Sequence, residues 1–216
     1  MVAELVGSDP WFVWVRTASP FRHPRDLKGA RIGVPRLGGS GHAFGRIVTK
    51  AHGIEKDVRF IGAGGLPELY AAIKLGRVDG MVEPMHLGIK LKMEGVIADI
   101  ASLGDYLPKE WVEHVVFARR DFVRSNPDIV RKAIKATLQA NDFLGKNPRW
   151  ALDRLKSMQG FSEEAAKIVL DRIQFSTTGR FDRKAVENLR NIFIEYGILS
   201  SKAPAVDEFY TNDYVS

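Results

Sequence analysis

The sequence predicts an α/β fold with a mainly parallel sheet, because short apolar strands alternate with single helices between Asp26 and Pro84. We expect strands at 30–34, 58–61 and 81–82, and helices at 42–51 and 66–75. Strand–helix–strand units of this kind give parallel pairing through right-handed crossovers. In such sheets ligands bind beyond the carboxyl ends of the strands, where the helices begin. A glycine-rich turn falls at that position after each of the first two strands.

The first glycine turn is the strongest candidate for a ligand site. Gly39, Ser40, Gly41 and His42 precede and open the expected helix. Glycine lets backbone N–H groups approach a ligand, and the first N–H groups of a helix favour a small anion. Ser40 and His42 add side-chain donors. The alternative is a tight turn in which Ser40 only caps the helix. The spacing matches neither the dinucleotide motif GxGxxG nor the phosphate loop GxxxxGK[ST].

Three weaker candidates lie at the ends of the next two strands. Gly64 and Gly65 belong to the second glycine turn, and Glu83 ends the third strand. Their position predicts that they line a cleft. We expect no catalytic residue, because no acid/base pair stands out.

Composition narrows the function classes. The 216 residues are 45% hydrophobic, carry a formal net charge of +6 and include no cysteine. The absence of cysteine excludes disulfides, thiolate catalysis and zinc fingers, and the five histidines form no HExxH motif. We therefore expect no metal and no cofactor. Basic residues are interleaved with acidic ones and no nucleic-acid-binding module is recognisable, so we expect no nucleic-acid partner. No apolar run is long enough to cross a membrane.

The rest of the chain is predicted to be mostly helical. A helix at 86–93 and a strand at 95–98 follow the third strand, and 111–118 is expected to form another strand. Helices are expected to start at Asn126-Pro127, at Pro148, after Ser162 and after Asp182, the last two residues acting as caps. In the first of these helices Ile129, Ile134, Leu138 and Phe143 are predicted to share one face.

Several segments together resemble a known family. They are DLKGARIGV (26–34), GSG (39–41), KLGRVDG (74–80), VEP (82–84) and the long segment 117–148. In this order they resemble the solute-binding proteins of ABC importers, in the nitrate/sulfonate/taurine and thiamine-precursor (NMT1/THI5-like) family. The resemblance implies a type II periplasmic-binding-protein fold with a discontinuous domain 1. It predicts that 1–25 is the last strand of domain 1 plus a crossover, 26–110 is the α/β domain 2, and 111–216 is the helical return to domain 1.

The same resemblance implies a function. We expect a small anionic or organic ligand, captured as two lobes close about hinges near 21–25 and 111–114, with an ABC permease as partner. The family implies a periplasmic or cell-surface location, although this chain opens with no signal-peptide pattern. We expect that the family's first half of domain 1 is absent, and that the incomplete domain 1 favours self-association. The alternative is a cytoplasmic enzyme on the same fold, of menaquinone or thiamine-precursor biosynthesis, although the pyrimidine-forming relatives carry a cysteine-rich motif. An intracellular ligand sensor is a third possibility.

Overall fold

The computed structural model describes residues 1–8 and 10–215 and divides the chain into two compact units. Unit 1 comprises Met1–Asp9 and Pro108–Ser216, and unit 2 comprises Pro10–Leu107. The first boundary differs from the expected one after residue 25. The reason is that β2 (Trp11–Arg16) pairs with β5 and β6 inside the sheet of unit 2. The second boundary lies within a few residues of the expected one.

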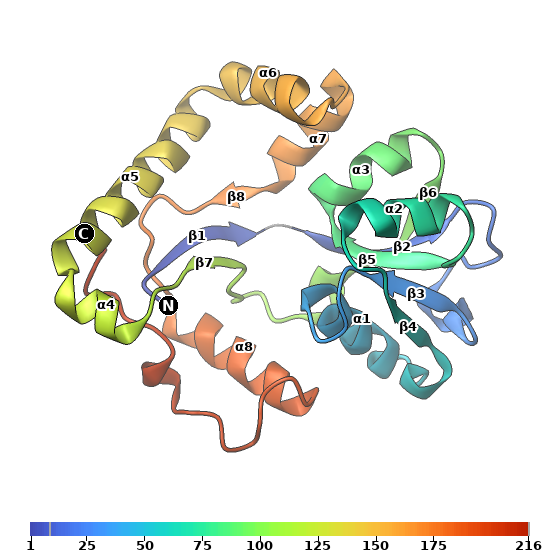
Figure 1. Ribbon diagram of the computed structural model, residues 1–216, viewed down its shortest axis with the longest axis horizontal. Helices are drawn as coiled ribbons and strands as arrows, with labels where there is room; N and C mark the ends of the chain where they lie inside the picture. Colours follow the sequence, from blue (N-terminus) through green and yellow to red (C-terminus); the bar gives the residue numbers. More distant parts are fainter. Residues whose placement is uncertain (9, 216) are drawn as a thin grey trace. The chain divides into compact units, whose positions relative to one another are not determined.

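Unit 2 contains a five-stranded sheet with the order β4-β3-β5-β2-β6 (Figure 1). Besides β2, its strands are β3 (Arg31–Val34), β4 (Arg59–Gly62), β5 (Gly80–Pro84) and β6 (Ile97–Ser102). β3 runs parallel to β4 and β5, whereas β2 runs antiparallel to both of its neighbours. The sheet is therefore mainly parallel in strand direction, as predicted, with β2 as its reversed strand.

Helices cover both faces of this sheet (Figure 1). α1 (Ser40–Ala51) packs on one face, and α2 (Leu66–Lys74) and α3 (Met85–Met93) pack on the other. Short 3-10 turns at Pro24–Leu27, Glu55–Asp57 and Leu103–Tyr106 complete the connections. Two glycines permit the close packing: a Cβ on Gly45 of α1 would lie 2.5 Å from the Phe60 ring, and one on Gly88 of α3 would lie 2.4 Å from the Trp14 ring.

The side chain of Trp14 packs between the unit 2 sheet and α3. It is fully buried, and its indole Nε1 donates a 2.8 Å hydrogen bond to the backbone carbonyl of Glu83. A buried tryptophan needs such a partner for its N–H group. The bond also ties β2 to the end of β5.

In its described residues, unit 1 combines a small antiparallel sheet with several helices (Figure 1). Its strand order is β7 (His114–Val116), β1 (Ala3–Ser8) and β8 (Gln174–Phe175). Its helices are α4 (Arg120–Ser125), α5 (Pro127–Lys146), α6 (Pro148–Gln159), α7 (Glu163–Arg172) and α8 (Arg183–Glu195), followed by a 3-10 turn at Val206–Glu208. The side chains of Ser162 and Asp182 accept the backbone N–H groups of Ala165 and Ala185, which confirms both predicted caps.

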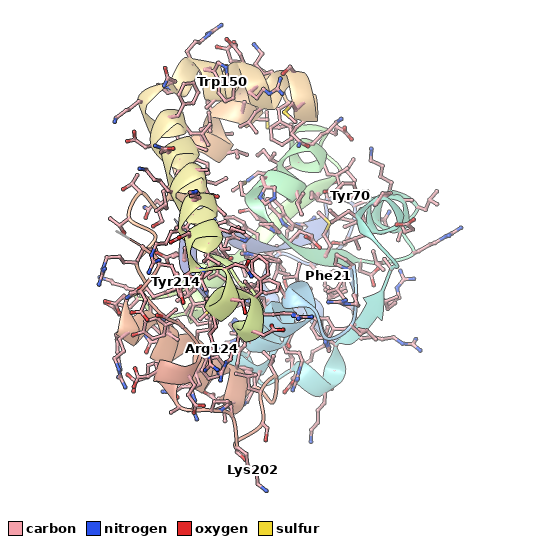
Figure 2. All side chains as sticks on the ribbon, turned by 60° about the vertical axis from the view of Figure 1, so that its left-hand side comes forward. Phe21, Tyr70, Arg124, Trp150, Lys202 and Tyr214 are labelled. Atoms are coloured by element: carbon pink, nitrogen blue, oxygen red, sulfur yellow. The ribbon has the colours of Figure 1, made fainter. Side chains whose placement is uncertain are left out.

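The buried face of α5 differs from the predicted one. Ile134 is buried as expected, but Ile129 is 56% exposed and Phe143 is 45% exposed. Phe143 packs edge-on against Trp150, labelled in Figure 2, with ring centroids 5.1 Å apart. Asn141 is buried instead, at 8% exposure.

Within the residues that the structure describes, none of the helices combines the length and the apolar character that crossing a membrane requires.

Candidate ligand-binding site

The carboxyl ends of β3, β4 and β5 meet at one edge of the unit 2 sheet, because these strands are parallel. Each strand is followed by a helix, so the N-termini of α1, α2 and α3 lie along this edge. All the predicted site residues fall within these three strand–helix junctions. The junctions differ, however, in what they offer a ligand.

The N-terminus of α1 is the junction best suited to an anion. Gly39 is the N-cap residue and Ser40 is the first residue of the helix, so the alternative that Ser40 caps α1 is wrong. Since Gly39 has no side chain, no side-chain oxygen accepts the first N–H groups of the helix, and its first turn carries no acidic residue. Gly38 adopts φ of +81°, which strongly favours glycine at this position. The exposed Ser40 can therefore act as a donor beside uncapped N–H groups.

His42 adds a neutral donor to this turn. Its Nδ1 accepts the backbone N–H of Gly38 at 2.9 Å, and its ring lies edge-on to Phe60 at 5.0 Å. Because Nδ1 is an acceptor, the ring proton belongs on Nε2. Burial, helped by the positive charge of Arg46, lowers the pKa of His42. The residue is thus a neutral hydrogen-bond donor at neutral pH rather than a fixed cation.

Gly41 has a structural role that is independent of any ligand. A Cβ at this position would lie 2.7 Å from the carbonyl oxygen of Val82. The absence of a side chain lets the start of α1 lie directly against the end of β5. The sequence signal at Gly41 is therefore explained by packing, whether or not its N–H also contacts a ligand.

The second glycine turn is less favourable to an anion. Gly64, at φ of +102°, already donates its N–H to the carbonyl oxygen of Pro35 at 3.1 Å. Gly65 is the N-cap of α2, and a Cβ on it would lie 2.7 Å from Oε2 of Glu68. A carboxylate thus lies at the start of α2, where it would repel a bound anion.

Glu83 lies on the opposite face of the sheet from α1. The side chain of Val82 faces α1, being near Gly45, and neighbouring residues of a strand point to opposite faces. Glu83 therefore points toward α2 and α3. It is 2% exposed, and burial raises its pKa to about 7. Its Oε1 has no hydrogen-bond partner among residues 1–8 and 10–215.

Tyr70 is the neighbour of Glu83 that sequence reasoning missed. Its hydroxyl, on α2 (labelled in Figure 2), donates to the carbonyl oxygen of Leu87 at 2.7 Å. Burial and the nearby charge of Glu83 raise its pKa to about 12. No sequence signal pairs these residues, because they meet only once α2 has packed on β5.

The described part of the chain contains no group of three or more His, Asp or Glu residues arranged to hold a metal ion. The edge of the sheet offers two kinds of polar group. Backbone and side-chain hydrogen-bond donors lie at the start of α1, and the buried carboxyl of Glu83 lies on the other face. These groups suit reversible binding of a small polar molecule.

Comparisons with known proteins identify a family and related sequences. Residues 1–151 match the family described as NMT1/THI5 like. A relative from Brucella abortus (strain 2308), named "Putative binding protein", is 26% identical over 204 residues, which are 90% of this chain and 63% of the relative. The chain thus spans somewhat less than two thirds of the length of such curated relatives.

Solved structures share the fold. The Candida albicans CA3427 gene product, described as having the generic periplasmic binding protein fold, matches with a TM-score of 0.80 and 17% identity over 96% of this chain and 69% of its own. The alkanesulfonate-binding protein SsuA from Xanthomonas axonopodis pv. citri, bound to MOPS, matches with a TM-score of 0.76 and 16% identity over 97% of this chain and 73% of its own.

Two further solved structures share this fold. The periplasmic nitrate-binding protein NrtA from Synechocystis PCC 6803 matches with a TM-score of 0.72 and 15% identity, over 98% of this chain and 65% of its own. The desulfurization enzyme DSZB matches with a TM-score of 0.61 and 16% identity, over 98% of this chain and 77% of its own.

The chain has the periplasmic-binding-protein fold. More particularly, the chain belongs to the NMT1/THI5-like family, as the sequence resemblance predicted.

Proposed function

We propose that the chain is a solute-binding component of an ABC importer that captures a small anion at the N-terminus of α1. The observation that carries this proposal is the uncapped first turn of α1, flanked by Ser40 and the neutral donor His42. Backbone N–H groups at a helix start bind anions without a full countercharge. Ligands named for proteins of the same fold, MOPS and nitrate, include a sulfonate and an inorganic anion.

The ligand-binding residues in this proposal fall into two groups. Ser40, Gly41 and His42 supply donors to the anion, while Gly39, whose N–H donates to the carbonyl oxygen of Arg36 at 3.2 Å, leaves the helix start without a side-chain cap. Gly64, Gly65 and Glu83 contribute less, because Glu68 lies over the start of α2 and Glu83 points toward the other face. Sulfonate, nitrate, taurine and thiamine-precursor ligands share this anchoring chemistry.

Closure of two lobes is the proposed mechanism of capture. The chain passes between the two units at residues 9–10 and 107–108. Of the two hinges expected from the sequence, 111–114 lies close to the crossing at 107–108, whereas 21–25 lies within unit 2. The proposed partner is an ABC permease, and the proposed location, by family, is the periplasm or the cell surface.

Calorimetry with Ser40→Ala tests the proposal. The purified chain is screened by thermal shift against MOPS, taurine, nitrate, phosphate and thiamine precursors, and any stabilising ligand is titrated. We expect Ser40→Ala to weaken binding by about 10- to 100-fold, because hydrogen bonds to charged groups contribute about 1.5–3 kcal/mol. Ser157→Ala, which alters an exposed serine of α6 in unit 1, is the matched control and leaves the affinity unchanged. Equal affinity in the two variants, or no stabilising anion, contradicts the proposal.

An enzyme on the same fold is the second candidate. It is favoured by one observation, the buried Glu83 with a pKa near 7, which suits a general acid or base at neutral pH. A structure of related fold, named as the desulfurization enzyme DSZB, supports this candidate. Turnover of a bound ligand by the wild type, abolished in Glu83→Gln, would favour this candidate over simple binding.

A further inference from the structure

Unit 1 contains a cavity that none of the predicted site residues lines. Its lining residues come mainly from α5, α6, α7 and β8, which Figure 1 labels, and its volume is about 300 Å³. This volume is at the lower end of the range for small-molecule sites. We call it the Asn141 pocket, after the most buried polar residue that lines it.

Asn141 presents a fixed hydrogen-bond acceptor to this pocket. Its side chain is 8% exposed, and Nδ2 donates to the carbonyl oxygens of Leu5 at 2.9 Å and Ser176 at 2.7 Å. Both N–H groups of the amide are used, so the amide cannot be turned around without losing two bonds. The remaining atom, Oδ1, accepts no hydrogen bond from the described part of the chain. A donor on a ligand in the pocket could therefore bond Oδ1 in place of solvent.

The walls of the Asn141 pocket select against anions. Leu170, Ile173 and Phe175 supply apolar surface, while Asp171 and Thr177 are its exposed polar residues. The described residues that line it include no lysine, arginine or histidine. The Asp171 carboxylate therefore has no basic neighbour in the pocket wall to offset its negative potential.

We propose that the Asn141 pocket binds a small molecule with an apolar body and one N–H or O–H donor, neutral or cationic, whose donor bonds Oδ1 of Asn141. A primary amine or an alcohol on an aromatic or branched alkyl group has this chemistry. The pocket prefers the opposite charge to the α1 turn of unit 2. The proposal therefore stands whether or not the anion proposal is correct.

The test is an NMR titration of the ¹⁵N-labelled full chain with benzylamine, benzyl alcohol and benzoate. These probes share one ring and differ in charge and donor. We expect saturable shifts at the amides of Asn141, Leu170 and Thr177 with benzylamine and, more weakly, with benzyl alcohol. Dissociation constants on the order of 1 mM suit probes of this size. Benzoate should produce no saturable shift at these residues.

Two variants test the geometry. A Cβ on Gly145, which lines the pocket, meets no atom within 4 Å, and leucine favours helix over glycine, so Gly145→Leu should fold while narrowing the pocket. It should weaken benzylamine binding by about tenfold or more. Asp171→Asn should weaken benzylamine but not benzyl alcohol, and Glu164→Gln, an exposed charge on α7 outside the pocket, should change neither.

The proposal is overturned by any of three results. One is the absence of saturable shifts at the pocket amides with both donor probes up to about 20 mM. The second is benzoate binding as tightly as benzylamine. The third is unchanged benzylamine affinity in Gly145→Leu, which would place the probes elsewhere. If that variant fails to fold, equal benzylamine affinity in Asp171→Asn and Glu164→Gln overturns the proposal instead.

Discussion

Ionisation of Glu83 should destabilise unit 2 as the pH rises through neutrality. Burial raises the pKa of this carboxyl from an ordinary value of 4.5 to about 7 in the folded chain. Between these two values the folded state binds more protons than the unfolded state, so stability falls with rising pH. The full loss, reached above about pH 8, corresponds to the whole pKa shift. At about 1.4 kcal/mol per pH unit, it amounts to roughly 3 kcal/mol.

The assay is urea unfolding at several values between about pH 5 and pH 8, followed through the amide resonances of β5 so that unit 2 is measured by itself. We expect Glu83→Gln to remove most of the fall in stability seen in the wild type. The pKa values of His42 and His52 are lowered in the fold, and they change stability in the opposite direction. Their contribution is common to both proteins and cancels in the difference.

Glu68→Gln is the matched control, because Glu68 is an exposed glutamate of the same unit. It should retain the pH dependence of the wild type. The reasoning is refuted if Glu83→Gln shows that same dependence, or if the Glu83 carboxyl carbon titrates near pH 4.5 in an NMR experiment.

Three further predictions concern packing, capping and association. Gly41→Ala should destabilise the chain by about 1–3 kcal/mol in urea unfolding, because its Cβ meets a carbonyl oxygen of β5 at 2.7 Å. Gly145→Ala, where a Cβ meets nothing within 4 Å, should instead stabilise by about 1 kcal/mol, and equal effects would contradict the packing argument. Ser162→Ala should cost about 1 kcal/mol through loss of the α7 cap, whereas Ser162→Asp should retain most of that stability. Light scattering should detect self-association of the chain that weakens in Phe117→Ser, since Phe117 is 78% exposed; a clean monomer would contradict this.

The helices and strands of unit 2 were predictable because their signals are local. The apolar strands, the glycine turns and the helices between 26 and 93 follow one another within short windows, and the structure has them in that order. The caps Ser162 and Asp182 were equally predictable, since a cap depends on three neighbouring residues.

The unit boundary and the burial of α5 were not predictable, since both depend on contacts distant in sequence. β2 belongs to unit 2 because it pairs with β5 and β6, about 65 to 90 residues away. On α5, the helical periodicity of apolar residues predicted that Phe143 would be buried. Asn141 is buried instead, and its Nδ2 donates hydrogen bonds to the carbonyl oxygens of Leu5 and Ser176. A polar residue that satisfies distant backbone groups leaves no periodic signal.

The separation of Glu83 from the α1 turn bears directly on charge selection. A carboxylate beside Ser40 would oppose an anion held by the uncapped N–H groups of α1, whereas Glu83 points to the other face of β5. Below about pH 7 the buried carboxyl is also protonated and contributes little field. Anion affinity at the α1 turn should therefore depend strongly on Ser40 and only weakly on Glu83. The expected difference between the two residues follows from the direction in which β5 points its side chains, which places Glu83 on the face of the sheet away from Ser40.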